Sequence, residues 1–312
     1  MTSDVIATVV AALNSKKSKG SARTLAEGSN SALVECIPTG ILPLDHHVIG
    51  CGGIPVGRVT ELYSEEGGGK SSLVYQIISQ TQKLGGTAIL VETENALHPE
   101  RVKVFGVDPK KLIVIEPEYL EQALEQLTEV FESLPEDAGP VFIGWDSLAA
   151  TPTKAEIDAG LVGGQAIADK ARIMSRACRT LTSYVAGKRI ALLIVNQTRT
   201  KMGVMFGDNT ITPGGAAMKF TASVRLRISG GKAVKDDNGD HLGKDILIAA
   251  WKNRLAPPFN KCRVRLTYAT GFDNEWTVLD FGKDRGVIKP RSRGKKAYDE
   301  VLKNMGWGDD KK

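Results

Sequence analysis

Eleven residues carry the side chains and glycines from which a phosphate site can be built. Residues 62 to 72 read LYSEEGGGKSS, in which Gly69, Lys70 and Ser71 have the types and order that close a phosphate-binding loop. The backbone N–H groups of such a loop point at phosphate oxygens, the lysine reaches the β and γ phosphates, and the serine hydroxyl binds Mg²⁺. The position where such a loop opens with glycine holds Ser64 instead. The stretch predicts a nucleotide site and leaves open whether that site works.

The sequence on each side of the loop supplies the elements that must hold it. An apolar run, RVTELY (58–63), leads into the glycines, and KSSLVYQIISQTQ continues from them as a helix. A helix that begins at Lys70 would turn its N-terminal N–H groups and its dipole toward bound phosphate. The glycines alone would be equally typical of a flexible turn, but the flanking strand and helix favour a nucleotide site.

Two further apolar runs end in carboxylates that nucleotide hydrolysis requires. PVFIGWD (140–146) ends in Asp146, which could associate with the magnesium ion, although a strand-end aspartate in a turn is the simpler interpretation. TAILVE (87–92) delivers Glu92 and Glu94 at its C-terminal end, where open α/β sheets bind ligands. Alternation along a strand places both glutamates on one face, so either could orient the attacking water.

The spacing of apolar runs predicts the fold class. From about residue 34, apolar strands alternate with helices, which is typical of an α/β fold with a mostly parallel, twisted sheet and helices on both faces. Further expected strands are KLIVIE (111–116), RIALLIV (189–195), SVRLRI (223–228), KDILIAAWKN (244–253) and CRVRLTY (262–268). YLEQALEQLTEVFESL predicts a packing helix, because its leucines share one face and its glutamates the other.

The two ends of the chain differ from this core. A helix from Asp4 to Asn14, with Asp4 as its cap, has an apolar face that must be buried on a neighbour, and a polar, basic stretch follows it. Residues 281–312 hold ten Lys or Arg against five Asp or Glu, and KAYDEVLKNMGW within them could form one helix. We therefore expect an N-terminal helix and arm (1–33), a core (34–280) and a short basic segment (281–312).

Composition excludes several other classes. The 312 residues are 42 % hydrophobic and 25 % charged, which is ordinary for a folded globular protein. A net charge of +5 fits a polyanionic partner but is too mild to establish one. The four cysteines form no CxxC pair, so neither a zinc site nor a disulfide framework is indicated. No signal peptide and no apolar run of the roughly 18 residues that cross a bilayer is found, so we expect a cytoplasmic protein with no membrane partner.

Segments spread along the chain resemble the RecA-type DNA recombinases of bacteria and phages. They are IPTGILPLDHHVIGCGGIPVGRVTELY, VETENALHPERVKVFGVD, WDSLAATPTKAEI, IVNQTRTKMGVMFGDNTITPGGAAMKFTASVRL and WKNRLAPPF. The resemblance runs from Asp4 to about Lys289. It implies a RecA-type ATPase core that uses ATP and Mg²⁺, polymerises as a homo-oligomeric helical filament on single-stranded DNA, pairs it with homologous double-stranded DNA and exchanges strands. The N-terminal helix would then hook onto the next subunit.

The resemblance also assigns roles to residues of this sequence. It implies that ATP is held by Glu66, Gly67, Gly68, Gly69, Lys70, Ser71, Ser72, Arg101 and Asp146, with Ser71 and Asp146 binding the metal. Glu94, rather than Glu92, aligns with the glutamate that activates water, and Gln197 with the glutamine that senses the γ phosphate. Lys252 and Arg254 match a pair that reaches an ATP held by the adjacent subunit. The implied catalytic set is Lys70, Glu94, Gln197, Lys252 and Arg254.

Two glycine-rich segments match the DNA-binding loops of that family, at about 154–172 and 198–220. The implied DNA-binding residues are Arg172, Arg199, Lys201, Met202, Gly203, Val204, Met205, Phe206, Gly214, Gly215 and Lys219. Cationic groups and glycine N–H groups track a phosphate backbone, while apolar side chains wedge between bases without reading sequence. Core packing is the less favoured alternative for the apolar residues among them.

Three departures from the family pattern bear on activity. Ser64 and Glu65 replace the glycine and proline that open the loop, and Gly67 and Gly68 are added glycines, so we expect a loop that binds ATP but is more mobile. His98 and Arg101 stand where an aspartate and a tyrosine usually contact adenine, so we expect loosened base selectivity. The C-terminal lobe is reduced to the basic stretch 287–296 and one helix, and removing 287–312 should weaken duplex capture if that stretch touches phosphates.

Two other classes of protein share some of these features. A DNA-coating protein that binds ATP with little turnover is compatible with Ser64 and the altered base contacts. A ring-forming motor with the same core, such as a replicative helicase, would not be expected to carry MGVMFG and KNRLAPPF in this arrangement. ATP hydrolysis with and without single-stranded DNA distinguishes the first, and the shape of the assembly distinguishes the second.

Overall fold

The computed structural model describes residues 2–14, 34–135, 137–160, 166–200, 210–211 and 215–307. Contacts divide the chain into two units, Met1–Glu35 and Cys36–Lys312. None of the described helices is long and apolar enough to cross a membrane.

The first unit contains helix α1 (Thr2–Asn14). It begins two residues earlier than the sequence suggested, so Asp4 lies in its first turn and is not its cap. Four of its apolar side chains are more than half exposed: Val5, Ile6, Val9 and Leu13. The expected apolar face is therefore present and exposed.

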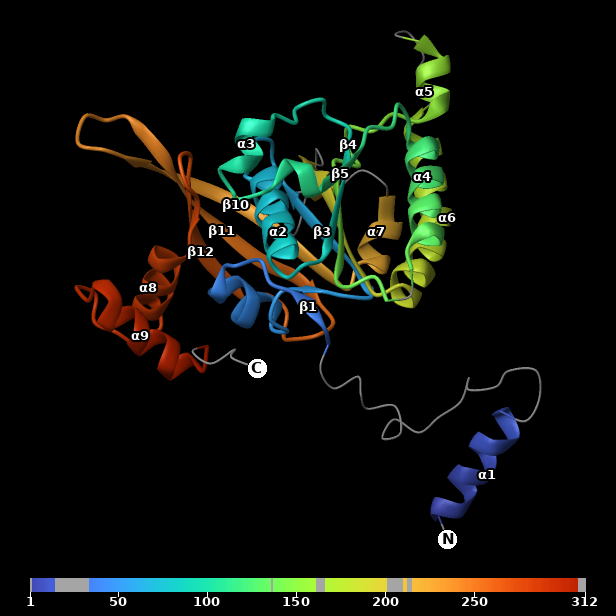
Figure 1. Cartoon of the computed structure of the whole chain (residues 1–312), viewed down its shortest axis with the longest axis horizontal. Coiled ribbons are helices and arrows are strands. Elements are labelled where there is room, and N and C mark those ends of the chain that lie inside the picture. The colour runs from blue at the N-terminus through green and yellow to red at the C-terminus, as the bar shows by residue number, and fades with distance from the viewer. Residues whose placement is uncertain are drawn as a thin grey trace. The chain divides into compact units, whose positions relative to one another are not determined.

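Nine strands of the described residues form one mixed sheet in the second unit (Figure 1). From one edge to the other they are β13 (Gly271–Asp273), β12 (Lys261–Thr267), β11 (His241–Asn253), β10 (Val224–Lys235), β3 (Arg58–Ser64), β7 (Ile190–Gln197), β6 (Val141–Asp146), β4 (Thr87–Glu92) and β5 (Leu112–Ile115). The strands from β10 to β5 run parallel to one another, and those from β10 to β13 are antiparallel. The expected strands all form, and the C-terminal ends of β3, β4, β6 and β7 meet at one edge.

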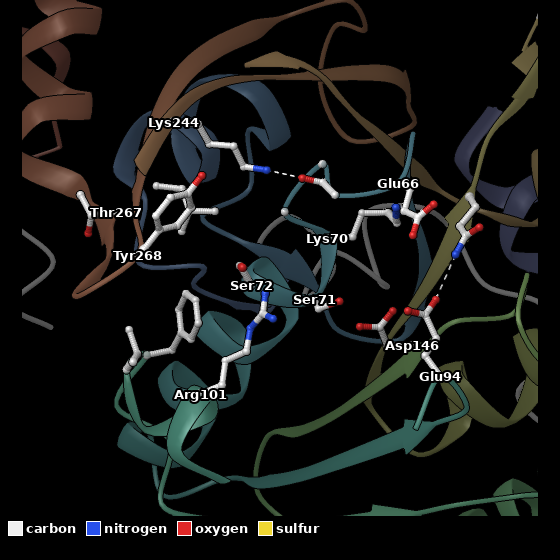
Figure 2. A pocket seen from close by; sticks show the side chains of 17 residues that line it. Glu66, Lys70, Ser71, Ser72, Glu94, Arg101, Asp146, Lys244, Thr267 and Tyr268 are labelled. Carbon is white, nitrogen blue, oxygen red and sulfur yellow. Dashed lines mark hydrogen bonds between the residues drawn. The ribbon is translucent and has the colours of Figure 1, made fainter. Parts of the chain in front are cut away.

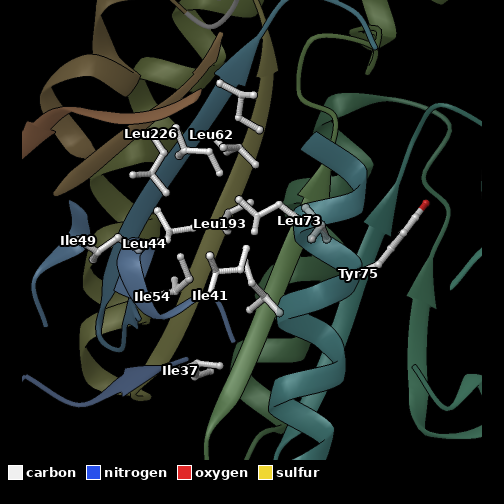
Figure 3. Close-up of a cluster of buried hydrophobic side chains, with 14 of the residues drawn as sticks. Ile37, Ile41, Leu44, Ile49, Ile54, Leu62, Leu73, Tyr75, Leu193 and Leu226 are labelled. Atoms are coloured by element: carbon white, nitrogen blue, oxygen red, sulfur yellow. The ribbon is translucent and has the colours of Figure 1, made fainter. Parts of the chain in front are cut away.

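Helices cover both faces of this sheet, as expected. On one face, α2 (Lys70–Lys83) packs its apolar side onto the strands, and Figure 3 shows Leu73 of α2 among Leu62, Leu193 and Leu226 of three neighbouring strands. On the other face, α4 (Leu120–Ser133) and α6 (Ala166–Gly187) bury Leu127 and Met174 in a second cluster. The predicted packing helix is thus α4, and its glutamates lie outside the core.

Short elements connect these layers. They are β1 (Cys36–Ile37), the helical segment η2 (Pro43–Ile49), β2 (Ile54–Pro55), α3 (Pro99–Lys103), η3 (Pro109–Lys111), α5 (Lys154–Asp158), β8 (Arg199–Thr200), β9 (Thr210–Ile211) and α7 (Gly215–Thr221).

A buried charged cluster joins the three central strands. Glu61 of β3 is fully buried, and its carboxylate accepts hydrogen bonds from Arg225 Nε of β10 and, at 2.8 Å, from Asn196 Nδ2 of β7. Asn196 directly precedes Gln197 at the end of β7. A buried carboxylate is tolerated only when it is paired and hydrogen-bonded in this way, so the cluster fixes the relative positions of these strands.

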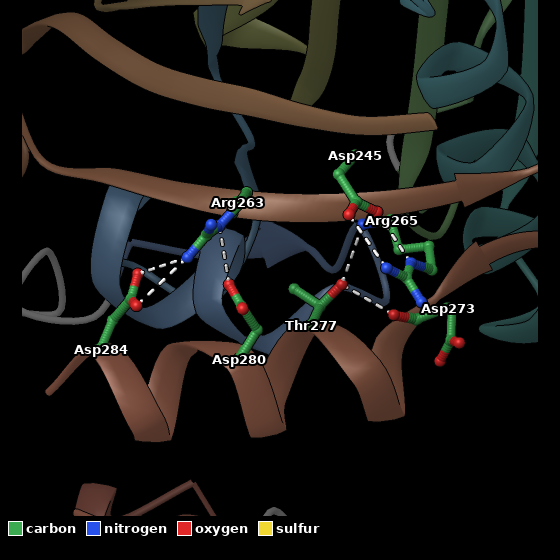
Figure 4. Close-up of polar contacts among 7 residues, drawn as sticks. All are labelled: Asp245, Arg263, Arg265, Asp273, Thr277, Asp280 and Asp284. Carbon is green, nitrogen blue, oxygen red and sulfur yellow. Dashed lines mark hydrogen bonds and ion pairs between the residues drawn. The ribbon is translucent and has the colours of Figure 1, made fainter. Parts of the chain in front are cut away.

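The C-terminal part of the chain forms two helices, α8 (Asn274–Asp284) and α9 (Gly294–Met305). Helix α8 was not expected; its N-terminus is capped by Asp273, whose side chain accepts the backbone N–H of Trp276 at 2.8 Å. The two helices pack together through a small buried cluster of Val278, Ile288, Ala297 and Val301. Figure 4 shows how ion pairs attach α8 to the sheet, with Arg263 of β12 bonded to Asp280 and Asp284.

Candidate nucleotide-binding site

The glycine-rich loop joins the C-terminal end of β3 to the N-terminus of α2, as its sequence predicted. Strand β3 ends at Ser64 and α2 begins at Lys70. Gly67 and Gly69 adopt φ values of 66° and 100°, a left-handed conformation that glycine reaches without the steric cost of a side chain. These turns bring the backbone N–H groups of the loop toward the start of the helix, where its dipole favours an anion.

Lys70 is held at the opening of this loop by Ser64. Its Nζ donates to Ser64 Oγ at 3.1 Å and to the carbonyl oxygen of Glu65 at 2.9 Å. Ser64 Oγ in turn donates to the Glu65 carbonyl at 2.6 Å. Burial lowers the pKa of Lys70, while Asp146 and Glu94 oppose that shift. The serine that departs from the usual glycine is therefore a direct hydrogen-bond partner of Lys70.

A pocket of about 430 Å³ opens above the loop (Figure 2). Its lining includes these residues that the sequence predicted: Glu66, Gly67, Gly68, Gly69, Lys70, Ser71, Ser72, Glu94, Arg101, Asp146 and Gln197. Six further residues were not predicted: Val104, Phe105, Lys244, Leu266, Thr267 and Tyr268. Figure 2 shows the carboxylates of Glu94 and Asp146 at one end of the pocket and the Tyr268 ring at the other.

Asp146 is placed to accept a cation. It ends β6 beside the loop and is 6 % exposed, and its Oδ1 has no hydrogen-bond partner. Burial raises the pKa of Asp146 to about 6, and the Ser71 hydroxyl counters part of that shift by hydrogen bonding. Among the described residues no three His, Cys, Asp or Glu side chains cluster as a metal site. One carboxylate and one hydroxyl nevertheless fit Mg²⁺, which takes few protein ligands when phosphate oxygens and water complete its shell.

The structure separates the two glutamates that the sequence could not distinguish by pattern. The Glu92 carboxylate accepts backbone N–H groups of Glu94, Asn95 and Ala96 at 2.9–3.2 Å, which shapes the turn after β4. Glu94 lines the pocket, and its Oε1 accepts Ser147 Oγ at 2.6 Å and Gln197 Nε2 at 3.2 Å. Glu92 therefore builds the turn, whereas Glu94 lines the pocket.

His98 and Arg101 have different positions in α3. The His98 side chain caps the helix by accepting the backbone N–H of Glu100 at 3.3 Å, and it does not line the pocket. Arg101 does line it, together with Phe105 from the end of the same segment. Of the two substitutions noted in the sequence, only the one at residue 101 lines the pocket.

Lys252 and Arg254 lie outside this pocket, near the end of β11. Lys252 Nζ donates to the carbonyl oxygens of Lys219 and Phe220 at 2.6 and 2.9 Å, and Arg254 donates to that of Phe220 at 3.0 Å. The pKa of Lys252 is lowered to about 8, mainly by burial and further by the positive charges of Arg254 and Arg225. The pair is thus tied to the C-terminal end of α7 and cannot serve the phosphate loop of its own chain in this arrangement.

The residues expected to bind DNA are described only in part. Lys201, Met202, Gly203, Val204, Met205, Phe206 and Gly214 lie outside the described residues. Arg172 is on α6 with its side chain 83 % exposed, Arg199 is in β8, and Gly215 and Lys219 are in α7. Among the described residues, the second expected loop begins directly after β7 and ends within α7.

A strand–loop–helix with a lysine and a serine, set beside carboxylates at the ends of parallel strands, defines a nucleoside triphosphate-binding protein of the phosphate-loop class. Comparison with known proteins identifies the family. Residues 4–273 match the RecA N-terminal domain family. The RecA protein of Ruminococcus albus is 39 % identical, over 90 % of this chain and 69 % of that protein. RecA of Heliobacterium modesticaldum is 39 % identical, over 87 % of this chain and 76 % of that protein. RecA of Francisella tularensis subsp. novicida is 38 % identical, over 94 % of this chain and 79 % of that protein.

The chain therefore belongs to the RecA family of recombination and repair proteins, and its core is a DNA-dependent ATPase of that family.

Proposed function

We propose that the pocket above the phosphate loop binds ATP with Mg²⁺ and hydrolyses it, and that this cycle controls a filament on single-stranded DNA. The observation that carries the proposal is that Lys70, Ser71, Glu94, Asp146 and Gln197 line one pocket although they come from four segments of the chain. Lys70 would move from Ser64 to the β and γ phosphates on binding, because a phosphate is a stronger acceptor for an ammonium group than a hydroxyl or a carbonyl.

Ser71 and Asp146 would hold the metal ion. The unpartnered Asp146 Oδ1 and the position of Ser71 at the helix N-terminus support this assignment. When bound, Mg²⁺ would neutralise charge on the β and γ phosphates. Ionised Asp146 is the form that can bind the ion, so binding would also hold this carboxyl deprotonated.

Glu94 would orient the attacking water, and Gln197 would report the state of the γ phosphate. Gln197 Nε2 bonds to Glu94 Oε1 at 3.2 Å, so a phosphate that attracts the amide would also free the carboxylate. Gln197 is directly followed by the segment expected to contact DNA. Nucleotide state and DNA contact would thus be linked through one side chain.

Assembly would complete the site. Lys252 and Arg254 would reach the ATP of an adjacent subunit, and the exposed apolar face of α1 would bind a neighbour's core. The partners we propose are single-stranded DNA, a homologous duplex and further copies of this chain, working in the cytoplasm. Both DNA contacts would be made to phosphates and stacked bases, so sequence would be matched by base pairing and not by the protein.

Joint-molecule formation tests this function. A single-stranded circle is mixed with a homologous or a heterologous linear duplex, ATP and Mg²⁺, while ATP hydrolysis is followed in the same samples. We expect joint molecules with the homologous duplex alone, and hydrolysis that increases on addition of single-stranded DNA. Lys70→Ala should abolish both, whereas Lys83→Ala at the exposed end of the same helix should abolish neither. Equal products from both duplexes would contradict the proposal.

A second candidate is a filament that coats DNA and binds ATP with little turnover. The observation in its favour is the hydrogen bond between Lys70 and Ser64, which nucleotide must displace. Saturable ATP binding with no stimulation of hydrolysis by single-stranded DNA would establish this candidate in place of the first.

A further inference from the structure

Lys244 is a cation of the pocket that belongs to neither the loop nor α3. It lies in β11, in register with Leu266 of β12, which also lines the pocket. Its side chain crosses from the antiparallel half of the sheet to the phosphate loop, where Nζ donates to the carbonyl oxygen of Gly67 (Figure 2). This contact joins two segments that lie more than 170 residues apart in the sequence.

The stem of Lys244 is packed against glycines. Its Cε would lie 4.0 Å from a Cβ placed on Gly69, and its Cδ 3.7 Å from one placed on Gly231. Behind the loop is a second cavity of about 310 Å³, which Lys244 also lines. The lysine thus lines both the pocket above the phosphate loop and this cavity, and it contacts the loop at Gly67.

The charge of Lys244 is poorly compensated as the structure stands. Among the described residues its hydrogen bond is to a neutral carbonyl, and no carboxylate forms an ion pair with it. Burial lowers the pKa of the amine, and the Arg101 guanidinium lowers it further. A cation in this setting gains most from an anion, and the anion that the loop is built to hold is phosphate.

We propose that Lys244 is a nucleotide-binding residue that contacts the phosphates of bound ATP and clamps the phosphate loop over them. The proposal rests on the ATP-binding function proposed above and adds a residue to it. Without nucleotide the amine binds Gly67; with nucleotide it exchanges this carbonyl for a phosphate oxygen, and the loop closes toward β11. The amine reaches the loop and not the Tyr268 ring, so the contact is with phosphate and not with the base.

Calorimetric titration of the full-length protein with ATP and with ADP, in Mg²⁺, tests this. Lys244→Met keeps the length of the stem and removes the charge. It should weaken binding of both nucleotides about tenfold, the cost of losing one charged hydrogen bond, and it should reduce the salt dependence of binding. Lys244→Arg should stay within about threefold of wild type. The matched control is Lys232→Met on the neighbouring strand β10, exposed and outside both cavities, which should leave both affinities unchanged.

Three results would overturn the assignment of Lys244. They are wild-type affinity in Lys244→Met, an equal loss in Lys244→Met and Lys244→Arg, or an equal loss in Lys232→Met. Failure of the wild-type protein to bind ATP at all would instead refute the proposed function itself. The two failures are therefore distinct, because only the second is seen without any substitution.

Discussion

The side chain of Ser64 occupies the space that a side chain on residue 68 would need. A Cβ built on Gly68 would overlap Ser64 Oγ and lie 2.9 Å from Ser64 Cβ. Rotation of the hydroxyl alone does not relieve this contact, because Cβ itself is too close and Ser64 is only 2 % exposed. Residues 64 and 68 are therefore coupled, because the serine at residue 64 leaves room only for glycine at residue 68.

This coupling predicts a reversal of effects in a double variant. Gly68→Ser alone should weaken ATP binding by about fivefold to a hundredfold, since overpacking a close contact costs about 1–3 kcal/mol. Ser64→Gly with Gly68→Ser should recover most of the loss, because the first change vacates the space that the second fills. ATP affinity of the two single variants and the double variant measures the coupling; additive effects would show that the two positions are independent.

Ser64→Gly alone should raise the ATPase turnover number. The change removes the hydroxyl that holds Lys70 but leaves the Glu65 carbonyl as its partner, so we expect a gain of about two- to tenfold and not more. Steady-state hydrolysis at saturating single-stranded DNA is the measurement. Unchanged affinity and unchanged turnover would show that Ser64 is inert.

Asp146 predicts a pH dependence of the magnesium requirement. Its pKa is raised to about 6 by burial, so the fraction able to bind Mg²⁺ falls as the pH is lowered through 6. The Mg²⁺ concentration for half-maximal ATP binding should rise steeply between pH 7 and pH 5.5. Asp146→Asn should need more Mg²⁺ at pH 7 and lose this dependence.

The raised pKa of Asp146 also affects folding stability in the absence of ligand. The folded state binds the proton of this carboxyl more tightly than the unfolded state, so Asp146 makes the folded protein more stable as the pH falls from about 6 toward 4.

Arg101 predicts weak discrimination between ATP and GTP. The residue lines the pocket with Phe105 and Tyr268, and a guanidinium can stack on either purine without selecting the adenine amino group. Arg101→Tyr should increase the preference for ATP. His98→Asp should not change it, because residue 98 caps α3 outside the pocket. The ratio of kcat/KM for the two nucleotides decides, and a strong ATP preference in the wild-type protein would contradict the prediction.

We expect the basic C-terminal stretch, residues 287–296, to help the protein bind duplex DNA. Deleting residues 287–312 is a poor test of this expectation. Ile288, Ala297 and Val301 pack onto α8, so removing residues 287–312 would expose that helix as well as remove charge. Replacing exposed Lys289, Arg291, Lys295 and Lys296 by Gln keeps the packing. If they touch phosphates, duplex binding should weaken and its salt dependence should become shallower, while Lys303→Gln on α9 should do neither.

The phosphate loop and its carboxylates could be predicted because local sequence determines them. The strand, the turn and the helix that hold Lys70 are consecutive, and apolar runs reveal where β4 and β6 end. The choice between Glu92 and Glu94 could not be made by alternation, because Glu94 lies beyond the strand end, in a turn that Glu92 itself shapes.

The far side of the pocket could not be predicted from local pattern. Lys244 belongs to β11 and Tyr268 directly follows β12, and the pairing of β10 with β3 brings these antiparallel strands beside the loop. Helix α8 was missed for a different reason: Asp273, whose side chain accepts the backbone N–H of Trp276, was not recognised as the cap of a helix. Long-range strand order, which residue type alone does not reveal, places Lys244 and Tyr268 at the pocket.

The hydrogen bonds from Lys252 and Arg254 to the end of α7 imply a difference between the two ends of a filament. Under the arrangement proposed here, ATP in one subunit draws this pair away from the Lys219 and Phe220 carbonyls of the next. A head-to-tail contact that continues as an open helical filament leaves one terminal subunit with no neighbour to supply the pair. That subunit would keep its ATP intact, and the end it occupies would be the last to dissociate from DNA.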